Sequence, residues 1–417
     1  MRVIELYSPH VHSVCYSIHV GAGSLTDHPS KPGVALLTQR CVVETDSAVR
    51  RRGIAHGRYT SGHVTPGEAY IFVSGHRSRG QEIAELVPRF LREAQFTEEA
   101  LELEKSVLWE SLPESYEVPY DVSDLIHRVL LEEGLNFSVT GTRDTLPSIT
   151  VEDVARRFDM YWVQPDVVLS VAGAYRERDL ALAAEGLRQV IEASGNPPPP
   201  RLHGGLTRER RTVIVPTVDE RFSLHLLFPD TEGGPRTQFM LRVLDCVLGN
   251  GPDSRVVKRL SWELGLGDMA GSDLWYLNDV LVLEVYVQGS YARFKKTVGA
   301  LARSVESLFL EPPEDAEVEE ALTILSHLQD YLLDDPQTAA PLRGTNFFLS
   351  RLSSANEFDK MFGGPRHVGP GDVHEVAQRI LSWDNLSILY MGPDPEATAE
   401  FLEHTWPYKE AEIWDNV

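Results

Sequence analysis

A short apolar stretch near the N-terminus has the spacing of a metal-binding motif but different side chains. Two histidines four residues apart lie on one face of a helix and can share a metal, and a nearby carboxylate can take a proton from metal-bound water. The chain has Leu36 and Arg40 at that spacing, with Gln39 beside them. Leu36 has no lone pair, Arg40 is permanently cationic, and Gln39 cannot accept a proton at neutral pH. Zinc hydrolysis is therefore not expected at this stretch.

The same residues also fit an ordinary amphipathic helix. In that interpretation Ala35, Leu36 and Leu37 lie in a core, and Arg40 faces solvent. The stretch alone does not distinguish an altered metal site from an ordinary amphipathic helix. The choice between these two interpretations depends on the surrounding elements.

Length and composition describe a globular protein of more than one domain. The 417 residues suit two or three domains of roughly 150 residues each, and 42% of them are hydrophobic and 24% charged. A net charge of −23 speaks against nucleic acid or an anionic membrane as the main partner. No segment approaches the ~18 apolar residues of a membrane span, and the first residues lack the apolar region of a signal peptide. We therefore expect a cytoplasmic location.

The cysteines do not indicate a disulfide or a thiolate metal site. Cys15, Cys41 and Cys246 lie in apolar runs without paired spacing, and we expect them to be reduced core residues.

A proline-rich run divides the chain into two similar halves. The sequence predicts a domain over 1–195, a linker over 196–205 that contains four consecutive prolines, and a second domain over 206–417. Similar features occur in the same order in both halves, which indicates a duplication. Each half begins with a strand, Gly/Pro turns and a helix, and each ends with a helix, a tryptophan, an apolar strand that closes at glycine, and a second helix. The residues concerned are 14–20, 33–43, 154–173 and 177–192 in the first half, and 222–228, 236–248, 376–392 and 396–404 in the second.

Two strands and a block of helices lie between these parts in each half. The expected strands cover about 53–60 and 68–74 in the first half, and about 266–272 and 280–288 in the second. The helical blocks cover roughly 80–135 and 292–351. Strands joined by hairpins, then helices, then one more strand and helix predict an α+β fold.

The first half resembles the M16 (insulinase, pitrilysin and mitochondrial processing peptidase) family. In that family Gly-aliphatic-Ala, here Gly33-Val34-Ala35, is followed by His-x-x-Glu-His on one helix. The resemblance places Leu36 and Arg40 at the two histidine ligands and Gln39 at the general base. Residues 104–111 resemble the helix of the third zinc ligand, which falls on Ser111, or on Glu110 if the frame shifts by one.

Two further segments carry the resemblance. Residues 53–61 resemble the family's glycine-rich hairpin, with Gly57 at its asparagine. Residues 249–268 resemble a glycine-led helix whose arginine and tyrosine contact substrate, and these two positions fall on Ser261 and Asp268. The polar groups of the family's site are therefore replaced in both halves.

The resemblance implies a fold and a function. It implies two homologous α/β-sandwich domains in tandem, each a mostly antiparallel sheet with helices packed on one side. It implies a catalytically silent M16B-type subunit that holds no metal and is no enzyme on its own, paired with a zinc-bearing homologue in a heterodimeric peptidase. The two chains would enclose a chamber in which peptide, for example a precursor peptide, adds to a sheet edge. The expected peptide contacts are His56, Gly57, Arg58 and Tyr59.

Two other hypotheses stay open. One is a non-proteolytic scaffold that resembles the core subunits of respiratory complexes. The other is an enzyme whose metal is held elsewhere, with His10, His12 and Glu110 as ligands.

Overall fold

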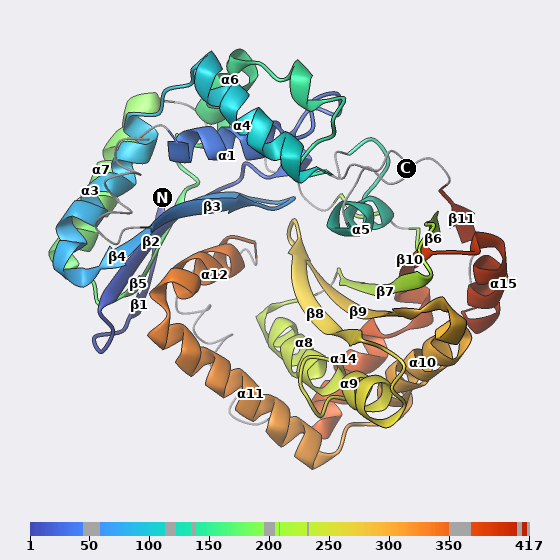
Figure 1. Ribbon diagram of the computed structural model, residues 1–417. Helices are drawn as coiled ribbons and strands as arrows, with labels where there is room; N and C mark the ends of the chain where they lie inside the picture. The colour runs from blue at the N-terminus through green and yellow to red at the C-terminus, as the bar shows by residue number, and fades with distance from the viewer. Residues whose placement is uncertain are drawn as a thin grey trace. The chain divides into compact units, whose positions relative to one another are not determined.

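The chain forms two compact units that exchange segments. The computed structural model describes residues 1–44, 59–112, 122–135, 138–195, 205–207, 209–231, 233–349, 368–406 and 411–414 (Figure 1). Unit 1 comprises Met1–Leu112, Gly134–Gly205 and Gln329–Ala355, and unit 2 comprises Pro113–Glu133, Leu206–Leu328 and Asn356–Val417. The units therefore do not coincide with the halves 1–195 and 206–417, because one segment of each half belongs to the other unit.

Unit 1 is built on a five-stranded sheet with the order β1-β5-β2-β4-β3. Only β1 and β5 are parallel, and the other neighbours are antiparallel. Its strands are β1 (Arg2–Tyr7), β2 (Ser13–Val20), β3 (Tyr59–Val64), β4 (Ala69–His76) and β5 (Val168–Gly173). Its helices are α1 (Val34–Glu44), α3 (Gly80–Arg92), α4 (Glu98–Ser111), α6 (Val151–Tyr161), α7 (Glu177–Ser194) and α12 (Pro336–Leu349).

Both faces of strand β2 are buried, and each face meets different helices. Val14, Tyr16 and Ile18 point into a core that includes Ile83 of α3 and Leu187 of α7. The intervening side chains face the opposite way, where Cys15 and Ala172 pack against Ala339 and Ala340 of α12. The second face of this sheet is thus covered by a helix that comes from the second half of the sequence, as Figure 1 shows beside β5.

Unit 2 repeats the topology of unit 1. Its sheet has the order β11-β6-β10-β7-β9-β8, with β6 parallel to β10 and the following neighbours antiparallel. The five strands from β6 to β8 have the same order and directions as the five of unit 1, and β11 adds in parallel to β6. The strands are β6 (Thr212–Pro216), β7 (Arg221–Asp230), β8 (Met269–Leu277), β9 (Val280–Ser290), β10 (Ser387–Gly392) and β11 (Ala411–Ile413).

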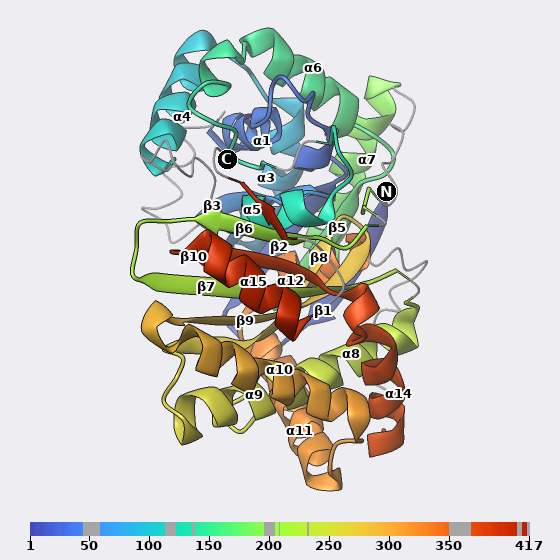
Figure 2. The ribbon, with the colours of Figure 1, turned by 90° about the vertical axis from the view of Figure 1, so that its right-hand side faces the viewer.

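Most helices of unit 2 pack on one face of its sheet. The ring of Phe222 of β7 meets that of Phe294 of α10 edge-on, and Figure 2 shows α15 in front of β7 and α10 below β9. The helices are α5 (Val122–Leu130), α8 (Pro235–Leu248), α9 (Arg255–Val257), α10 (Phe294–Leu310), α14 (Pro370–Ile380) and α15 (Pro395–Thr405), with π-helical residues Lys258–Glu263 after α9. Helix α11 (Asp315–Asp334) contributes residues to both units.

The α+β class with two similar, mostly antiparallel sheets is confirmed. The expected helices are found, whereas two expected strands have other limits. Strand β8 begins at Met269, after Gly265, whose φ of +57° does not continue a strand. Strand β3 extends to Val64, and the expected strand residues 53–58 lie outside the described part of the chain.

Two further expectations concern the cysteines and the membrane. All three cysteines are free and buried, as expected. Within the described ranges, no helix combines the length and apolar character that crossing a membrane requires.

Candidate functional site

Helix α1 carries the altered motif and is fixed at its N-terminus by a buried carboxylate. Asp27 is 6% exposed and accepts hydrogen bonds from the backbone N–H groups of Gly33 and Ala35, both at 3.1 Å. A guanidinium nitrogen of Arg157 lies 2.7 Å from Oδ1 of this carboxylate. Burial raises the pKa of Asp27 to about 6 even though Arg157 and the backbone hydrogen bonds favour ionisation. The start of α1 is thus tied to α6.

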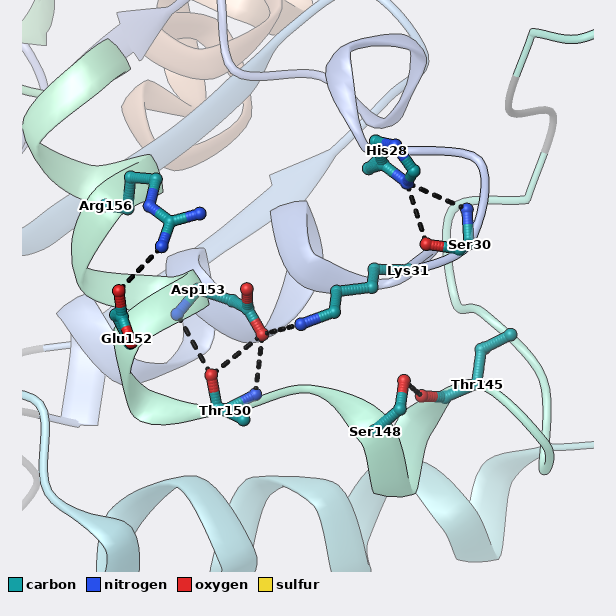
Figure 3. A network of polar contacts seen from close by, with 9 residues as sticks. All are labelled: His28, Ser30, Lys31, Thr145, Ser148, Thr150, Glu152, Asp153 and Arg156. Carbon is teal, nitrogen blue, oxygen red and sulfur yellow. Dashed lines mark hydrogen bonds and ion pairs between the residues drawn. The ribbon is translucent and has the colours of Figure 1, made fainter.

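A second contact joins the loop before α1 to α6. Lys31 Nζ lies 2.5 Å from Asp153, which also forms a capping box with Thr150 at the start of α6 (Figure 3). Burial opposes the ionisation of Asp153, but the hydrogen bonds from Lys31 and Thr150 outweigh it and lower its pKa. Two ion pairs therefore set the position of the loop from which α1 begins.

The three motif positions on α1 have different surroundings. Leu36 is half-buried between two apolar clusters. Gln39 is 3% exposed and lies against strand β3, since a Cβ on Gly62 would stand 2.3 Å from its Nε2 atom. Arg40 donates from Nη1 to Glu104 of α4 at 3.3 Å, and the Glu104 side chain is 9% exposed. A fixed cation of the protein therefore neutralises a buried carboxylate where α1 faces α4.

The expected third position lies away from this pair. Ser111 is exposed at the end of α4 and donates to the carbonyl of Leu108 at 2.6 Å, and Glu110 beside it is also exposed. His10 lies 2.7 Å from Asp334, and His12 stacks on His76. Across the described residues, no three His, Cys, Asp or Glu side chains are grouped as a metal site would need.

Strand β3 forms one edge of the sheet of unit 1. Among the described strands it pairs only with β4. Tyr59 is 49% exposed with its ring 5.7 Å from that of Phe72, and His63 lies beside Tyr70. His56, Gly57 and Arg58, the other expected peptide contacts, lie outside the described residues.

The two motif positions of unit 2 lie near its own edge strand. Ser261 is on the π-helical turn beside Trp262, which is 71% exposed. Asp268 is exposed just before β8 and forms an ion pair with Arg221 at the start of β7. The side chain expected to contact substrate is therefore held by another strand of the same sheet.

A polar cluster that no motif in the sequence had predicted occurs once in each unit. In unit 1, Ser17 Oγ lies 2.8 Å from His19 Nε2, and His19 Nδ1 lies 3.1 Å from Glu68. Tyr70 stands directly opposite His19 on β4. Burial, followed by the nearby Glu68, raises the pKa of this tyrosine to about 12, so its hydroxyl stays protonated.

The same four residue types recur in unit 2. Ser223 Oγ lies 2.7 Å from His225 Nε2, and His225 Nδ1 lies 2.6 Å from Glu284. Tyr286 stands opposite His225 on β9, as Tyr70 does opposite His19. The signal in the sequence was Ser-x-His on one strand and Glu-x-Tyr at its partner, in both halves.

The comparisons with known proteins agree with this duplicated fold. Residues 148–325 match the family model described as the peptidase M16 inactive domain. A crystal structure of a peptidase M16 inactive domain from Pseudomonas fluorescens superposes with a TM-score of 0.79 at 15% identity, over 94% of this chain and 95% of that one. The chain thus contains a segment that matches an M16 family model and shares its overall fold with this M16 structure.

Two other solved structures share the fold of this chain. A protease from Helicobacter pylori superposes with a TM-score of 0.77 at 16% identity, over 94% of this chain and 97% of that one. A chain of complex III2 from Candida albicans superposes with a TM-score of 0.72 at 14% identity, over 96% and 97% of the two chains. No curated protein sequence matches the chain.

Proposed function

We propose that the chain is the non-catalytic subunit of a heterodimeric M16-type peptidase, and that a zinc-bearing homologue supplies the metal. The observation that carries the proposal is helix α1, which is anchored by Asp27 and Lys31 although its face bears Leu36, Gln39 and Arg40. Helix α1 keeps its position although it lacks metal ligands. This supports a role for the chain that depends on its fold and not on a bound metal.

Peptide binding in this proposal uses the edge of unit 1. An extended peptide adds to an edge strand through main-chain hydrogen bonds and is selected by alternate side chains. Strand β3 offers an edge, and Tyr59 presents an exposed aromatic ring beside it. The substrate is then a peptide, such as a precursor peptide that is trimmed by the complex. The three free cysteines suit a reducing compartment, so the proposal includes a cytoplasmic location.

The test is reconstitution with a zinc-bearing M16 homologue from the same organism. The chain and the homologue are purified separately and together, and cleavage of a peptide library is followed by mass spectrometry. We expect a stable complex whose cleavage is at least tenfold faster than that of the homologue alone and is abolished by a chelator. Cleavage by the isolated chain that survives the chelator would contradict the proposal.

A matched pair of variants tests the role of the edge. Tyr59→Ala removes the exposed ring at the start of β3, whereas Tyr331→Ala removes a still more exposed ring on α11. We expect Tyr59→Ala to raise the KM of the complex several-fold and Tyr331→Ala to leave it unchanged. Equal effects of the two variants would exclude β3 as the binding edge.

A scaffold role is the second candidate, and the likeness to a chain of complex III2 favours it. It predicts that the chain copurifies with a complex that does not cleave peptides. Affinity purification of the tagged full-length chain, followed by peptide cleavage assays on what it brings down, separates the two candidates.

A further inference from the structure

We propose that Ser223 of unit 2 is a nucleophile that accepts acyl groups from small activated esters, with His225 as its general base. This activity is independent of zinc and of the proposed peptidase partnership. Its basis is the hydrogen-bonded chain from Ser223 Oγ through the His225 ring to the carboxylate of Glu284, with distances of 2.7 and 2.6 Å.

The hydrogen bonds link serine, histidine and glutamate in the order that nucleophilic catalysis requires. The second oxygen of Glu284 accepts a hydrogen bond from Trp275 Nε1 at 2.8 Å, which fixes the carboxylate. Since that carboxylate accepts from Nδ1, the neutral ring carries its proton on Nδ1 and turns the Nε2 lone pair toward the hydroxyl of Ser223. A serine, a base and a group that orients the base are the three parts of an activated hydroxyl nucleophile.

Ser223 lies in a row of side chains that is open to solvent. The sheet register places Met391 on one side of it and Gln288 on the other, with Met269 beyond Gln288 on the edge strand. Ser223, Gln288 and Met391 are partly exposed and Met269 is 55% exposed, so a small molecule can reach this row. Gln288 stands directly opposite Ser223 in this register, and in the proposal its amide N–H group stabilises the developing oxyanion.

The equivalent cluster of unit 1 does not have this access. Ser17 and His19 are both 0% exposed, and a Cβ on Gly344 of α12 would stand 1.9 Å from His19 Nε2. Phe72, which cannot donate a hydrogen bond, stands opposite Ser17 where Gln288 stands opposite Ser223. The serine of this cluster is thus closed off in unit 1 and partly exposed in unit 2, whereas the histidine is buried in both.

The proposed reaction needs no reagent other than the ester and water. Ser223 Oγ attacks the ester carbonyl carbon while its proton passes to His225 Nε2, and the negative charge collects on the carbonyl oxygen. The carbonyl re-forms as the C–O bond to the leaving alcohol breaks, and His225 returns the proton to that alcohol. Water then hydrolyses the acyl-serine by the same steps and releases the carboxylic acid.

The test is covalent labelling of the full-length chain with a fluorophosphonate probe. Ser223 Oγ forms the P–O bond, fluoride leaves, and His225 takes the proton. We expect mass spectrometry to place the label on Ser223, and S223A to lower labelling at least tenfold. The matched variant S17A changes the buried serine of unit 1 and should leave the labelling rate unchanged. Labelling of the wild type no greater than that of S223A would overturn the proposal.

Two further measurements test the roles of His225 and Gln288. H225Q should slow labelling at least tenfold and Gln288→Leu should slow it several-fold, in variants whose circular dichroism matches the wild type. If H225Q does not fold, the pH dependence of wild-type labelling takes its place, and the rate should rise with pH to a plateau as one group loses its proton. A rate that stays proportional to hydroxide would overturn the role of His225.

Discussion

In unit 1 the sheet face that carries Ser17 and His19 is buried beneath α12, whereas in unit 2 the face that carries Ser223 is partly exposed. Strand order, strand directions and the four polar residue types are the same in both units. The two units differ in what covers this face of the sheet. The same cluster is therefore fully buried in unit 1, whereas its serine is partly exposed in unit 2.

A second inherited feature differs in the same way. Asp27 pairs with Arg157 in unit 1, and Asp230 pairs with Arg379 in unit 2 at 2.6 Å. The Arg157 side chain is 6% exposed, but that of Arg379 is 32% exposed.

The largest expected effect is on the buried ion pair of unit 1. Arg157→Ala leaves the Asp27 carboxylate buried without its cation and should lower the free energy of unfolding by about 3–5 kcal/mol. Arg379→Ala should cost about 1–3 kcal/mol, since the Arg379 side chain is itself partly exposed. Urea unfolding followed by circular dichroism measures both. Arg156→Ala, at an exposed neighbouring arginine, is the control and should change stability by less than about 0.5 kcal/mol.

The next effect is a dependence of stability on pH. Burial raises the pKa of Asp27 and of Asp245 from 3.8 to about 6. The folded chain then binds these protons more tightly than the unfolded chain does, so the stability that these two carboxyls contribute is fully present below about pH 4 and is lost as pH rises through 6. The loss is about 3 kcal/mol per group. Asp27→Asn and Asp245→Asn should each flatten the slope between pH 4 and 7, and unchanged slopes in urea titrations would rule out these two carboxyls as its source.

A smaller effect is expected where α12 meets the sheet of unit 1. Gly344→Ala places a methyl group on the His19 ring and should cost about 1–3 kcal/mol. Gly371 is exposed in the first turn of α14 with open space around it, so Gly371→Ala should be neutral or stabilising by up to about 1 kcal/mol. Thermal melting measures the stability of both variants. If Gly344→Ala does not change the stability, α12 does not pack closely against this face of the sheet.

The smallest effect concerns the two serines. Ser17→Ala leaves the buried Nε2 of His19 without its partner and should cost about 1–2 kcal/mol. Ser223→Ala should cost less than about 0.5 kcal/mol, because water can replace the lost hydroxyl at a partly exposed site. The urea midpoints of the two variants measure both losses of stability. Equal losses would mean that water is excluded equally from the two clusters.

The helices and strands could be predicted from the sequence better than the elements against which they pack. Alternation over 14–20 and the Gly/Pro turn before 236–248 located a strand and a helix that the structure contains. The apolar pattern of α12 marks a buried helix, but the pattern does not say which sheet will bury it. The spacing of Leu36 and Arg40 predicted a helix face, whereas the pairing of Arg40 with Glu104 depends on how α1 packs against α4.

The clusters around His19 and His225 could be predicted from the sequence only in part. Ser-x-His on a strand places two side chains on one face, and this follows from the period of a strand. Their glutamates are 49 and 59 residues away, so they could be assigned only once the register of β2 with β4 and of β7 with β9 was known.

The exchange of segments between the units has a consequence for folding during synthesis. The sheet of unit 1 is complete once β5 has been made, but α12, which covers its second face, ends only at Leu349. Until the ribosome has added those later residues, Cys15, Ser17 and His19 have no cover on that face. Contacts across such long sequence separations form late and slowly. A chain truncated at the proline-rich run should therefore aggregate, although it contains every strand of unit 1.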